Sequence, residues 1–600
     1  MTDIEAFSHT GIRTYYQNLP IFPTSSPEEW EWSTVFWRKI ERSVDNLQRR
    51  IYKAFKNGRF NMARKLSKLL LNSTGSILLN VRRVTQDNAG KKTAGVDGKK
   101  ALDAKARKEL VEEIIGLSKK KWKNYKARAI RRVYIPKTPT KKRPLGIPII
   151  KDRAIQSVEK TALEPYWEAQ FEANSYGFRP AHSAHDAIEA IFININRQKK
   201  WVLDADIKGC FDHIAHEPLL EKLKGFPGRR LIKQWLKADI IDNGKRHKTE
   251  EGTPQGGIIS PLLANIALDG MDRFVLEKLK SHSKVAAKVV RYADDFVVLH
   301  EDKAIVELAK SYIQEWLASV GLELSEEKTK IVHTTDGFDF LGFNIRHYPK
   351  LKKGYIADKI QRQTRQDFTT LIQLAKGKVK AHIHELGEII KKSRAVSAEE
   401  LIGKLQPKIT GFANYYRFCC YSDAFGKITH WLRHLLWVWA KRRHPNKGYR
   451  WVADKYFTLE KGKRWHFKDD KGNTLKYPKG TNRRYVKVRE GKSYYDGDIL
   501  YWGLRLSKGY GEITPSKAKM LKKQDGFCFY CQNQFKAEDK MESHHLIHKE
   551  DGGQDKYGNL ALMHKHCHDQ YHAEYIKLRD NLRRSQGYVK AGNMWIKFQD

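Results

Sequence analysis

The sequence predicts a multidomain protein of the α+β class. Its 600 residues are more than one hydrophobic core covers, since a domain usually holds about 100–200 residues. Apolar residues at helical spacing mark the regions from about 30 to 85 and from about 360 to 443, and short strand-like runs separated by turns lie between them. Near the C-terminus, cysteines and histidines cluster at metal-ligand spacing. These observations indicate helical, mixed and metal-stabilised parts in series.

The chain is strongly basic along its whole length. It holds 113 Lys and Arg residues against 69 Asp and Glu residues, which gives a net charge of +44. A folded chain of this charge needs a polyanionic partner to offset its self-repulsion. Because the bases are not confined to one tail, we expect an extended nucleic acid that touches several domains. A basic chain that binds no polyanion is the alternative.

The cysteine pattern and the hydropathy indicate the kind of cellular compartment in which the protein acts. No stretch reaches the roughly 18 apolar residues that a membrane helix needs, so no membrane partner is expected. The acidic N-terminus lacks the apolar region of a signal peptide. Three of the six cysteines, Cys528, Cys531 and Cys567, cluster at the C-terminus. This pattern is typical of metal binding in a reducing compartment.

Two strand-like segments carry carboxylates. A short apolar run ends at Asp204 and Asp206, and side chains alternate along a strand, so these two acids share one face. Residues 289–299 predict a hairpin with Asp294 and Asp295 at its tip. Adjacent acids repel each other and are costly to desolvate without a cation. If the tip lies beside Asp206, three carboxylates can hold two Mg²⁺ ions about 3.5–4 Å apart. A solvated turn is the alternative for an isolated Asp-Asp pair.

Further segments follow the order of one family. They are the Gly-rich loop at 86–98, a hairpin at 132–148, Asn-Ser-Tyr-Gly-Phe-Arg-Pro at 174–180, Thr-Pro-Gln-Gly-Gly at 253–257 and a strand-like stretch at 338–343. With the acidic segments, they resemble reverse transcriptases, and more narrowly the group II intron-encoded proteins, over nearly the whole chain. The resemblance implies a right-hand polymerase with fingers, palm and helical thumb. A basic DNA-binding segment and a ββα-metal HNH domain would follow.

The resemblance divides the chain into five parts. They are the N-terminal extension of the fingers with its Gly-rich loop (1–98), the reverse transcriptase fingers and palm (99–350), the helical thumb or maturase domain (351–445), the DNA-binding segment (446–510) and the HNH endonuclease domain (511–600). In the thumb, Trp431, Leu435 and Val438 recur at helical spacing and are expected in the core. In the DNA-binding segment, basic and aromatic residues interleave, so the rings either stack on bases or pack in a small core.

The resemblance also assigns roles to eight polymerase residues. The catalytic acids, which would hold the two Mg²⁺ ions, are Asp206, Asp294 and Asp295. The residues that would contact the substrates are Lys137, Arg143, Phe211, Gln255 and Lys328. Lys137 and Arg143 of the hairpin would meet the incoming triphosphate, and Lys328 would lie near the phosphates. Phe211 would exclude a 2′-hydroxyl, and Gln255 would lie under the templating pair. For Phe211 and Lys328, core packing and a solvated lysine are near-equal alternatives.

Two residue pairs near the C-terminus have the spacing of zinc ligands. Cys528 and Cys531 form one pair, and His564 and Cys567 form the other. Four such ligands suit a tetrahedral structural Zn²⁺ that ties together the loops of a small domain. The family often has Cys at the position of His564, so a histidine outside the zinc site is the alternative. We expect zinc chelation to loosen only residues after about 511.

The residues around these pairs resemble an HNH endonuclease. The resemblance makes His545 the general base and Asn559 the residue that fixes its loop, while His544 and His568 would hold one catalytic Mg²⁺. A neutral histidine can take a proton from water near pH 7. The family often has Asp at the position of His544, and both residue types bind metals. A structural zinc finger without hydrolysis is the alternative.

Together these features predict an RNA-directed DNA polymerase that is also an intron RNA maturase and a site-directed DNA endonuclease. In a ribonucleoprotein, the nuclease would nick one DNA strand and leave a 3′-hydroxyl. The palm would extend that end with dNTPs and copy the intron RNA. The expected place of action is the bacterial cytoplasm or nucleoid, with an organelle as the alternative. An RNA-binding splicing factor with dispensable enzymatic sites and a defence-associated reverse transcriptase are the other functions considered.

Overall fold

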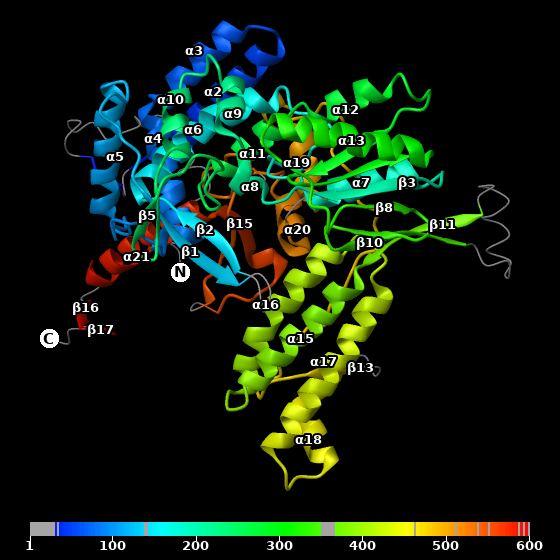
Figure 1. Cartoon of the computed structure of the whole chain (residues 1–600). Coiled ribbons are helices and arrows are strands. Elements are labelled where there is room, and N and C mark those ends of the chain that lie inside the picture. Colours follow the sequence, from blue (N-terminus) through cyan, green and yellow to red (C-terminus); the bar gives the residue numbers. More distant parts are fainter. Residues whose placement is uncertain are drawn as a thin grey trace.

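The computed structural model describes residues 30–32, 35–136, 142–349, 367–460, 464–510, 513–536, 539–549, 552–585, 588–591 and 594–597, and the statements below concern these residues. The fold mixes helices and small sheets (Figure 1). Among the helices of these ranges, none has both the length and the apolarity that crossing a bilayer requires.

Helices form the N-terminal part, as the helical spacing predicts. They are α2 (Trp37–Lys56), α3 (Phe60–Leu71), α4 (Thr74–Arg82), the short turns η2 (Arg83–Asp87) and η3 (Ala89–Lys92), and α5 (Ala104–Lys119). On α2, Ile40, Val44 and Ile51 lie on one face and are buried. This face packs against α4 and α6 (Ile150–Glu168), and α6 is itself buried on nearly every side. The N-terminal helices are thus anchored on the centre of the molecule.

A first sheet has the strand order β2-β1-β4-β5. Its strands are β1 (Ile130–Pro136), β2 (Lys142–Ile147), β4 (Ile240–Asp242) and β5 (Lys245–His247). β1 and β2 form the antiparallel hairpin that the sequence predicts, and β4 adds to β1 in parallel. The hairpin therefore extends from the body as part of a larger sheet.

The central sheet has the antiparallel order β6-β7-β3-β8. Its strands are β6 (Lys288–Tyr292), β7 (Asp295–His300), β3 (Trp201–Asp206) and β8 (Lys330–His333). Alternate residues face two different cores. Leu203 and Val298 pack toward α13 (Lys303–Ser319), whereas Val202 and Val297 pack toward α7 (Ala184–Ile195). The remaining helices of this part are α8 (Cys210–His213), α9 (His216–Lys222), α10 (Arg229–Leu236), α11 (Ser260–Leu268) and α12 (Met271–Leu279).

A third sheet leads into a helical arm. The sheet holds β9 (Phe338–Phe340), β10 (Phe343–Pro349) and β11 (Phe368–Leu374), and the arm holds α15 (Lys376–Lys392), α16 (Ala398–Tyr416) and α17 (Ser422–Arg443). Figure 1 shows the arm projecting away from the rest of the molecule. The helical pattern is expected from about 360, but among the described residues after 366 the strand β11 comes first and pairs with β10 along its whole length, so helix begins there at α15.

The core of the arm continues past residue 445. It includes Val452 of α18 (Tyr449–Tyr456), Phe457 of β12 (Phe457–Glu460) and Phe467 of β13 (Arg464–Phe467), which pack with Trp439. The expected boundary between 445 and 446 therefore runs through one hydrophobic core. Its apolar residues are sparse and lie among Lys, Arg and Gly, so composition suggested a separate segment.

The prediction that Trp431 and Val438 are core residues is wrong. Their side chains are 50% and 45% exposed, whereas Leu435 is half-buried. The buried face of α17 is made by Phe425, Ile428, Leu432, Leu436 and Trp439. Apolar residues occupy two adjacent stripes of this helix, and helical spacing alone does not show which stripe faces inward.

The aromatic residues of the 446–510 segment pack rather than project. Tyr485, Tyr495 and Trp502 are buried, and the Tyr495 hydroxyl donates to Glu164 Oε2 over 2.7 Å. Asp186, fully buried, accepts hydrogen bonds from Tyr485, the Val488 amide and Arg505. The elements here are η4 (Tyr494–Asp496) and α19 (Ile499–Ser507). Of the two arrangements considered for these rings, stacking on bases or packing in a small core, the structure shows packing.

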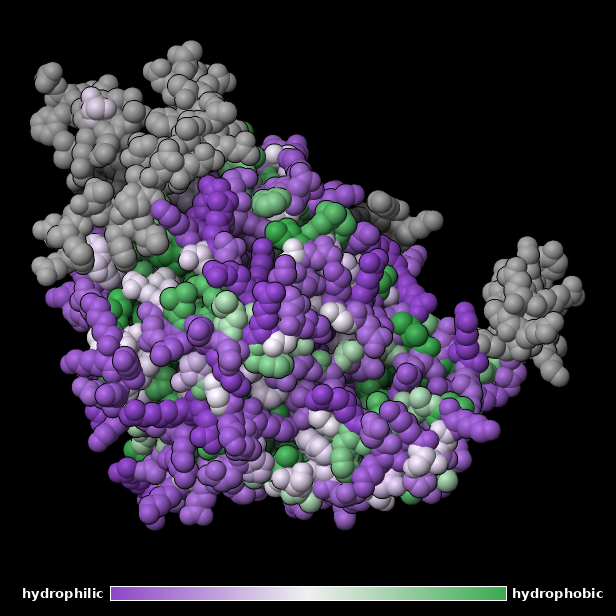
Figure 2. Space-filling model, turned by 90° about the horizontal axis from the view of Figure 1, so that it is seen from above, coloured by the Kyte–Doolittle hydropathy of each residue, from purple (hydrophilic) through white to green (hydrophobic). Residues whose placement is uncertain are grey.

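The C-terminal part has two antiparallel strands followed by a helix. They are β14 (Met541–His545), β15 (Leu560–His564) and α21 (Lys565–Ser585), flanked by α20 (Pro515–Lys523), η6 (Tyr557–Asn559), β16 (Tyr588–Ala591) and β17 (Met594–Lys597). Leu521, Phe535 and Leu562 form its small core together with the buried cysteines. Figure 2 shows a surface that is mainly hydrophilic with small, separate hydrophobic patches, as expected for a chain this basic.

Candidate functional site

Asp206 and the 294–295 tip lie side by side on the central sheet. Asp206 ends β3 and stands directly opposite Asp295, the first residue of β7. Asp294 lies in the turn between β6 and β7. The register therefore brings together the three acids that the sequence singled out.

A second segment shapes the tip. The amide of Tyr176 donates to Arg291 O, and Arg291 N donates to Asn174 O, so residues 174–176 run beside β6. A Cβ at Gly177 would lie 2.3 Å from the Ala293 nitrogen. Ala293 itself has a φ of 59°, which is uncommon for a residue with a side chain. Only glycine permits this close approach to the tip, which explains the Gly in the 174–180 motif.

The acids raise one another's pKa. Burial raises the pKa of Asp295, and repulsion from Asp294 and Asp206 raises it further. Burial and the charge of Asp206 likewise raise the pKa of Asp294. Burial and Asp339 raise the pKa of Asp204 to about 6. An all-oxygen donor set whose carboxylates repel one another fits Mg²⁺, whose charge would favour the ionised carboxylates.

Lys328 contacts one of these acids. Its Nζ lies 2.5 Å from Asp206 Oδ2, and this hydrogen bond raises the pKa of Lys328. The Lys328 side chain is 55% exposed, so it pairs with Asp206 while remaining in contact with solvent. Within the described part of the chain, the oxygens of the three carboxylates are not gathered as tightly as the ligand atoms of the three histidine-containing groups below, which lie within 4.8 Å of one another in each group.

Three of the other expected substrate residues, Arg143, Phe211 and Gln255, lie in the described part of the chain. The charge of Arg143 lowers the pKa of Asp294, so the guanidinium is within electrostatic reach of the tip. Phe211 is half-buried and stands edge-on to Phe178 at 6.1 Å. The backbone oxygen of Gln255 accepts a hydrogen bond of 2.6 Å from the Gly146 amide, which ties the 253–257 loop to β2. Lys137 lies outside the described residues.

Four buried side chains form the expected zinc cluster. They are Cys528, Cys531, His564 and Cys567. His564 Nδ1 lies 3.4 Å from Cys531 Sγ and 3.8 Å from Cys567 Sγ, so the ring faces the sulfurs. Its other nitrogen, Nε2, lies 3.0 Å from Asp539 Oδ2, which fixes the orientation of the ring. The donor set and its burial fit Zn²⁺, and His564 belongs to the cluster.

A second cluster holds three histidines. His544 is buried, and neither of its ring nitrogens has a hydrogen-bond partner. Its ligand atoms lie within 4.8 Å of those of His568 and His572. A neighbouring group, Glu542, His568 and Asp569, shares one of these histidines. Orphaned ring nitrogens aimed at other imidazoles fit a divalent metal.

His545 and Asn559 lie beside this cluster. His545 Nε2 lies 2.6 Å from Asp555 Oδ1, and Lys549 pairs with the other oxygen of Asp555. The Asn559 side chain accepts from the Ile547 amide over 2.7 Å and donates to Ile547 O over 3.0 Å. The asparagine thereby closes the loop that follows His545.

Four family models match segments of this chain. The model described as reverse transcriptase (RNA-dependent DNA polymerase) matches residues 135–345, and that of the N-terminal domain of reverse transcriptase matches residues 32–114. The group II intron, maturase-specific domain matches residues 379–457, and HNH endonuclease matches residues 528–574. Asp206, Asp294 and Asp295 fall within the reverse transcriptase match, and His544, His545, His564 and His568 fall within the HNH match.

Relatives narrow the family. Protein YkfC of Escherichia coli is 35% identical over 309 residues, which cover 45% of this chain and 80% of YkfC. The group II intron-encoded protein LtrA of Lactococcus lactis is 36% identical over 288 residues. The chain belongs to the group II intron-encoded proteins. The LtrA match covers 37% of this chain and 47% of LtrA, so the alignment spans about half of that relative. An uncharacterized 91 kDa protein in a cob intron of Schizosaccharomyces pombe is 30% identical over 48% of this chain and 43% of its own length.

In this group II intron-encoded protein, sequence reasoning missed three polar residues of the nuclease. His572 lies four residues after His568 on α21, and that spacing alone places both on one helix face. Asp555 and Asp539 had no such signal, because each approaches its histidine from a loop.

Proposed function

We propose that this protein performs target-primed reverse transcription as part of a ribonucleoprotein with its intron RNA. It would act as an RNA-directed DNA polymerase, a maturase and a DNA endonuclease. The observation that carries the proposal is the position of Asp206 opposite Asp295, with Asp294 at the adjoining tip, on a chain that also holds a nuclease-type histidine cluster. Polymerase and nuclease are the two activities needed to make a primer end and extend it.

The polymerase would have right-hand geometry. The N-terminal helices and the β1–β2 hairpin would be the fingers, the central sheet the palm and the arm the thumb. A cavity of about 590 Å³ lies between Asp295 and the arm, and Lys378, His382 and Tyr415 line it. This is where a primer–template duplex would pass from the acids onto the thumb.

Each polymerase residue has a chemical task. Held by Asp206, Asp294 and Asp295, Mg²⁺ would lower the pKa of the primer 3′-hydroxyl and offset the charge of the transferring phosphoryl group. Arg143 and Lys328 would neutralise the triphosphate. Phe211, backed by Phe178, would close the space beside the sugar.

The nuclease would use His545 as its base. The Nε2–H group of His545 would donate a hydrogen bond to Asp555 Oδ1. The other ring nitrogen, Nδ1, would then be the one that takes a proton from water. A divalent metal held by His544, His568 and His572 would stabilise the departing oxygen. Three imidazoles are softer donors than Mg²⁺ prefers, so we propose a transition ion in place of the Mg²⁺ expected from the sequence.

The exposed stripe of α17 supports RNA binding by the maturase domain. It consists of residues at helical spacing that are all exposed, namely Lys427, Trp431, His434, Val438 and Arg442. Cations can follow a phosphate backbone while an exposed indole stacks on a base.

A pair of tryptophans on α17 tests this RNA surface. Trp431→Ala should weaken binding of the intron RNA about tenfold, since stacking contributes about 1–3 kcal/mol per base, and should leave the melting temperature unchanged. Trp439→Ala, on the buried face, should instead cost about 3–5 kcal/mol of stability. Filter binding and thermal unfolding measure the two effects. An RNA affinity unchanged in Trp431→Ala would place the RNA elsewhere.

The central experiment uses the ribonucleoprotein on a DNA target. The wild type should nick the second strand and extend it with dNTPs. Asp294→Asn should nick without making cDNA, and His545→Ala should extend only a pre-nicked DNA. Full cDNA synthesis by Asp294→Asn would show that these acids are not the polymerase site. A wild type that supports splicing but makes no cDNA would instead support the splicing factor with dispensable enzymatic sites. A protein that co-purifies with no intron RNA would support the defence-associated reverse transcriptase. We place the reaction where the intron DNA lies, in the bacterial cytoplasm or an organelle.

A further inference from the structure

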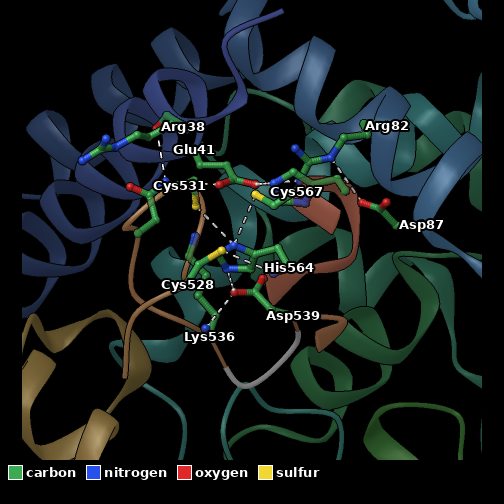
Figure 3. A network of polar contacts seen from close by, with 12 residues as sticks. Arg38, Glu41, Arg82, Asp87, Cys528, Cys531, Lys536, Asp539, His564 and Cys567 are labelled. Atoms are coloured by element: carbon green, nitrogen blue, oxygen red, sulfur yellow. Dashed lines mark hydrogen bonds and ion pairs between the residues drawn. The ribbon is translucent and has the colours of Figure 1, made fainter. Parts of the chain in front are cut away.

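The zinc module of the nuclease, defined as residues 528–536, 539–540 and 564–567, contacts helix α2 (Figure 3). Asn533 Nδ2 donates to Glu41 Oε2 over 3.2 Å, and Arg42 Nε donates to Asn533 Oδ1 over 2.9 Å. Lys536 pairs with Asp45 one turn further along the helix. The contact thus joins two parts of the chain about 490 residues apart.

The zinc ligands shape the nuclease side of this contact. Asn533 and Lys536 follow the ligand Cys531 within five residues, and His566 lies between the ligands His564 and Cys567. His566 Nε2 is 3.3 Å from Glu41 Oε1. Because a bound zinc fixes both ligand-bearing loops, it also fixes the atoms that meet α2.

The α2 side of the contact is preorganised. Glu41 is 9% exposed, and its Oε1 lies 2.7 Å from the Arg82 guanidinium. Arg82 is in turn held by Asp87 at 3.2 Å and stands over the Trp37 ring. A buried carboxylate that is already paired keeps one oxygen for Asn533 without leaving an isolated charge. Lys540 adds a hydrogen bond to the backbone oxygen of Asp87.

Both ends of this contact are continuous with an active site. The zinc ligands share one hydrophobic core with β14 and β15. Strand β14 carries His544, and strand β15 ends at His564. Helix α2 packs on α6, in the core that includes Leu203 and Ala205 of strand β3. The distance between the two active sites is therefore set by packed elements rather than by a linker alone.

We propose that the zinc module docks the nuclease on helix α2 and that this contact fixes where the second DNA strand is nicked relative to the polymerase. The inference rests on the proposed function, and it adds a positioning role for Glu41, Arg42 and Asp45. If the nuclease were only tethered, nicks would scatter over the range that the tether reaches. Docking also extends the effect of zinc loss to α2, beyond the residues after about 511 that the sequence led us to expect.

A charge exchange across the contact tests the docking. Asp45→Lys and Lys536→Asp should each separate the surfaces, and the double variant should restore them. Amide exchange over residues 37–56 should become at least about tenfold faster in each single variant and return to the wild-type rate in the double variant. Glu109→Lys, an exposed acid on α5, is the matched control and should change nothing.

The position of the nick provides the functional readout. In the single variants, second-strand nicks should spread over several nucleotides and fall about tenfold in yield, while the double variant restores one position. Arg42→Ala removes an exposed side chain, cannot unfold the module and should produce the same scatter in weaker form. Chelating zinc from the wild type should speed amide exchange over 37–56 as well.

Two results would overturn the docking. One is unchanged exchange over 37–56 in both single variants and in the zinc-free protein. The other is a sharp, unshifted nick in Asp45→Lys and Arg42→Ala. If the wild type makes no second-strand nick at all, the proposed function fails, but amide exchange still decides whether the module is docked.

Discussion

The polymerase acids and the nuclease ligands are brought together in different ways. Asp206 and Asp295 meet because β3 and β7 pair across the central sheet, and a third segment at Gly177 supports the tip. The zinc and histidine clusters are assembled within residues 528–572, by two strands, one helix and their loops. The first site therefore depends on the packing of the whole molecule, whereas the second depends on metal and local contacts.

Removing a zinc ligand should produce the largest effect. Structural zinc binding contributes about 10–16 kcal/mol in small zinc modules, so Cys531→Ser should unfold residues 513–585 and abolish nicking. Primer extension on a supplied primer should stay within about twofold of wild type. Zinc content, amide exchange and both activities measure this. A loss of primer extension equal to the loss of nicking would contradict the local character of the nuclease site.

Gly177→Ala should lower the polymerase activity without changing any of the three acids. The added Cβ would lie 2.3 Å from the Ala293 nitrogen, so the tip must shift. A shift of the reacting groups by about 1 Å can lower the rate about 100-fold. Single-turnover primer extension should fall accordingly, with nicking unchanged. Gly116→Ala, where a Cβ meets open space, is the control.

His572→Ala should distinguish the catalytic metal site of the nuclease from its zinc site. Loss of one of three imidazoles should reduce nicking about 100-fold and weaken binding of the catalytic metal. The zinc content should stay at one ion per chain, because His572 does not belong to the Cys528 cluster. Metal titration followed by nicking measures this, and unchanged metal affinity would point to the Glu542 group instead.

Asp204→Asn should have the smallest effect, which is a change in the stability of the folded protein that depends on pH. The pKa of Asp204 is raised to about 6 in the folded protein, above its ordinary value of 3.8. The ionised form is thus disfavoured by folding, so this aspartate destabilises the metal-free protein above pH 6 and ceases to do so as the pH falls toward 4. Asp204→Asn should raise stability by about 1–3 kcal/mol at pH 7.5 and by little at pH 4. Denaturant unfolding at both pH values checks the sign.

Local spacing predicted much of both sites. Alternation on β3 placed Asp204 and Asp206 on one face, and the hairpin pattern put Asp294 at a tip. The pairs of zinc ligands were readable from their separations of three residues. What brings β3 beside β7 is a long-range pairing, and for this the order of the family's motifs was the guide.

Polar contacts between distant segments could not be predicted. Nothing near Glu41 in the sequence indicates that Asn533 will reach it, and Asp539 and Asp555 give no signal beyond their charge. Burial on α17 was assigned to the wrong stripe because two apolar stripes were available. The arm extends past residue 445 because a few apolar residues within a basic segment complete its core.

The contact between Asp45 and Lys536 also has a consequence for synthesis of the chain. The two residues are 491 positions apart, so at about 5–20 residues per second a ribosome needs roughly 25–100 s to deliver the second after the first. During that interval the surface of α2 around Asp45 is uncovered. A nascent chain therefore exposes this acidic position to the surrounding cell well before its own C-terminal part can cover it.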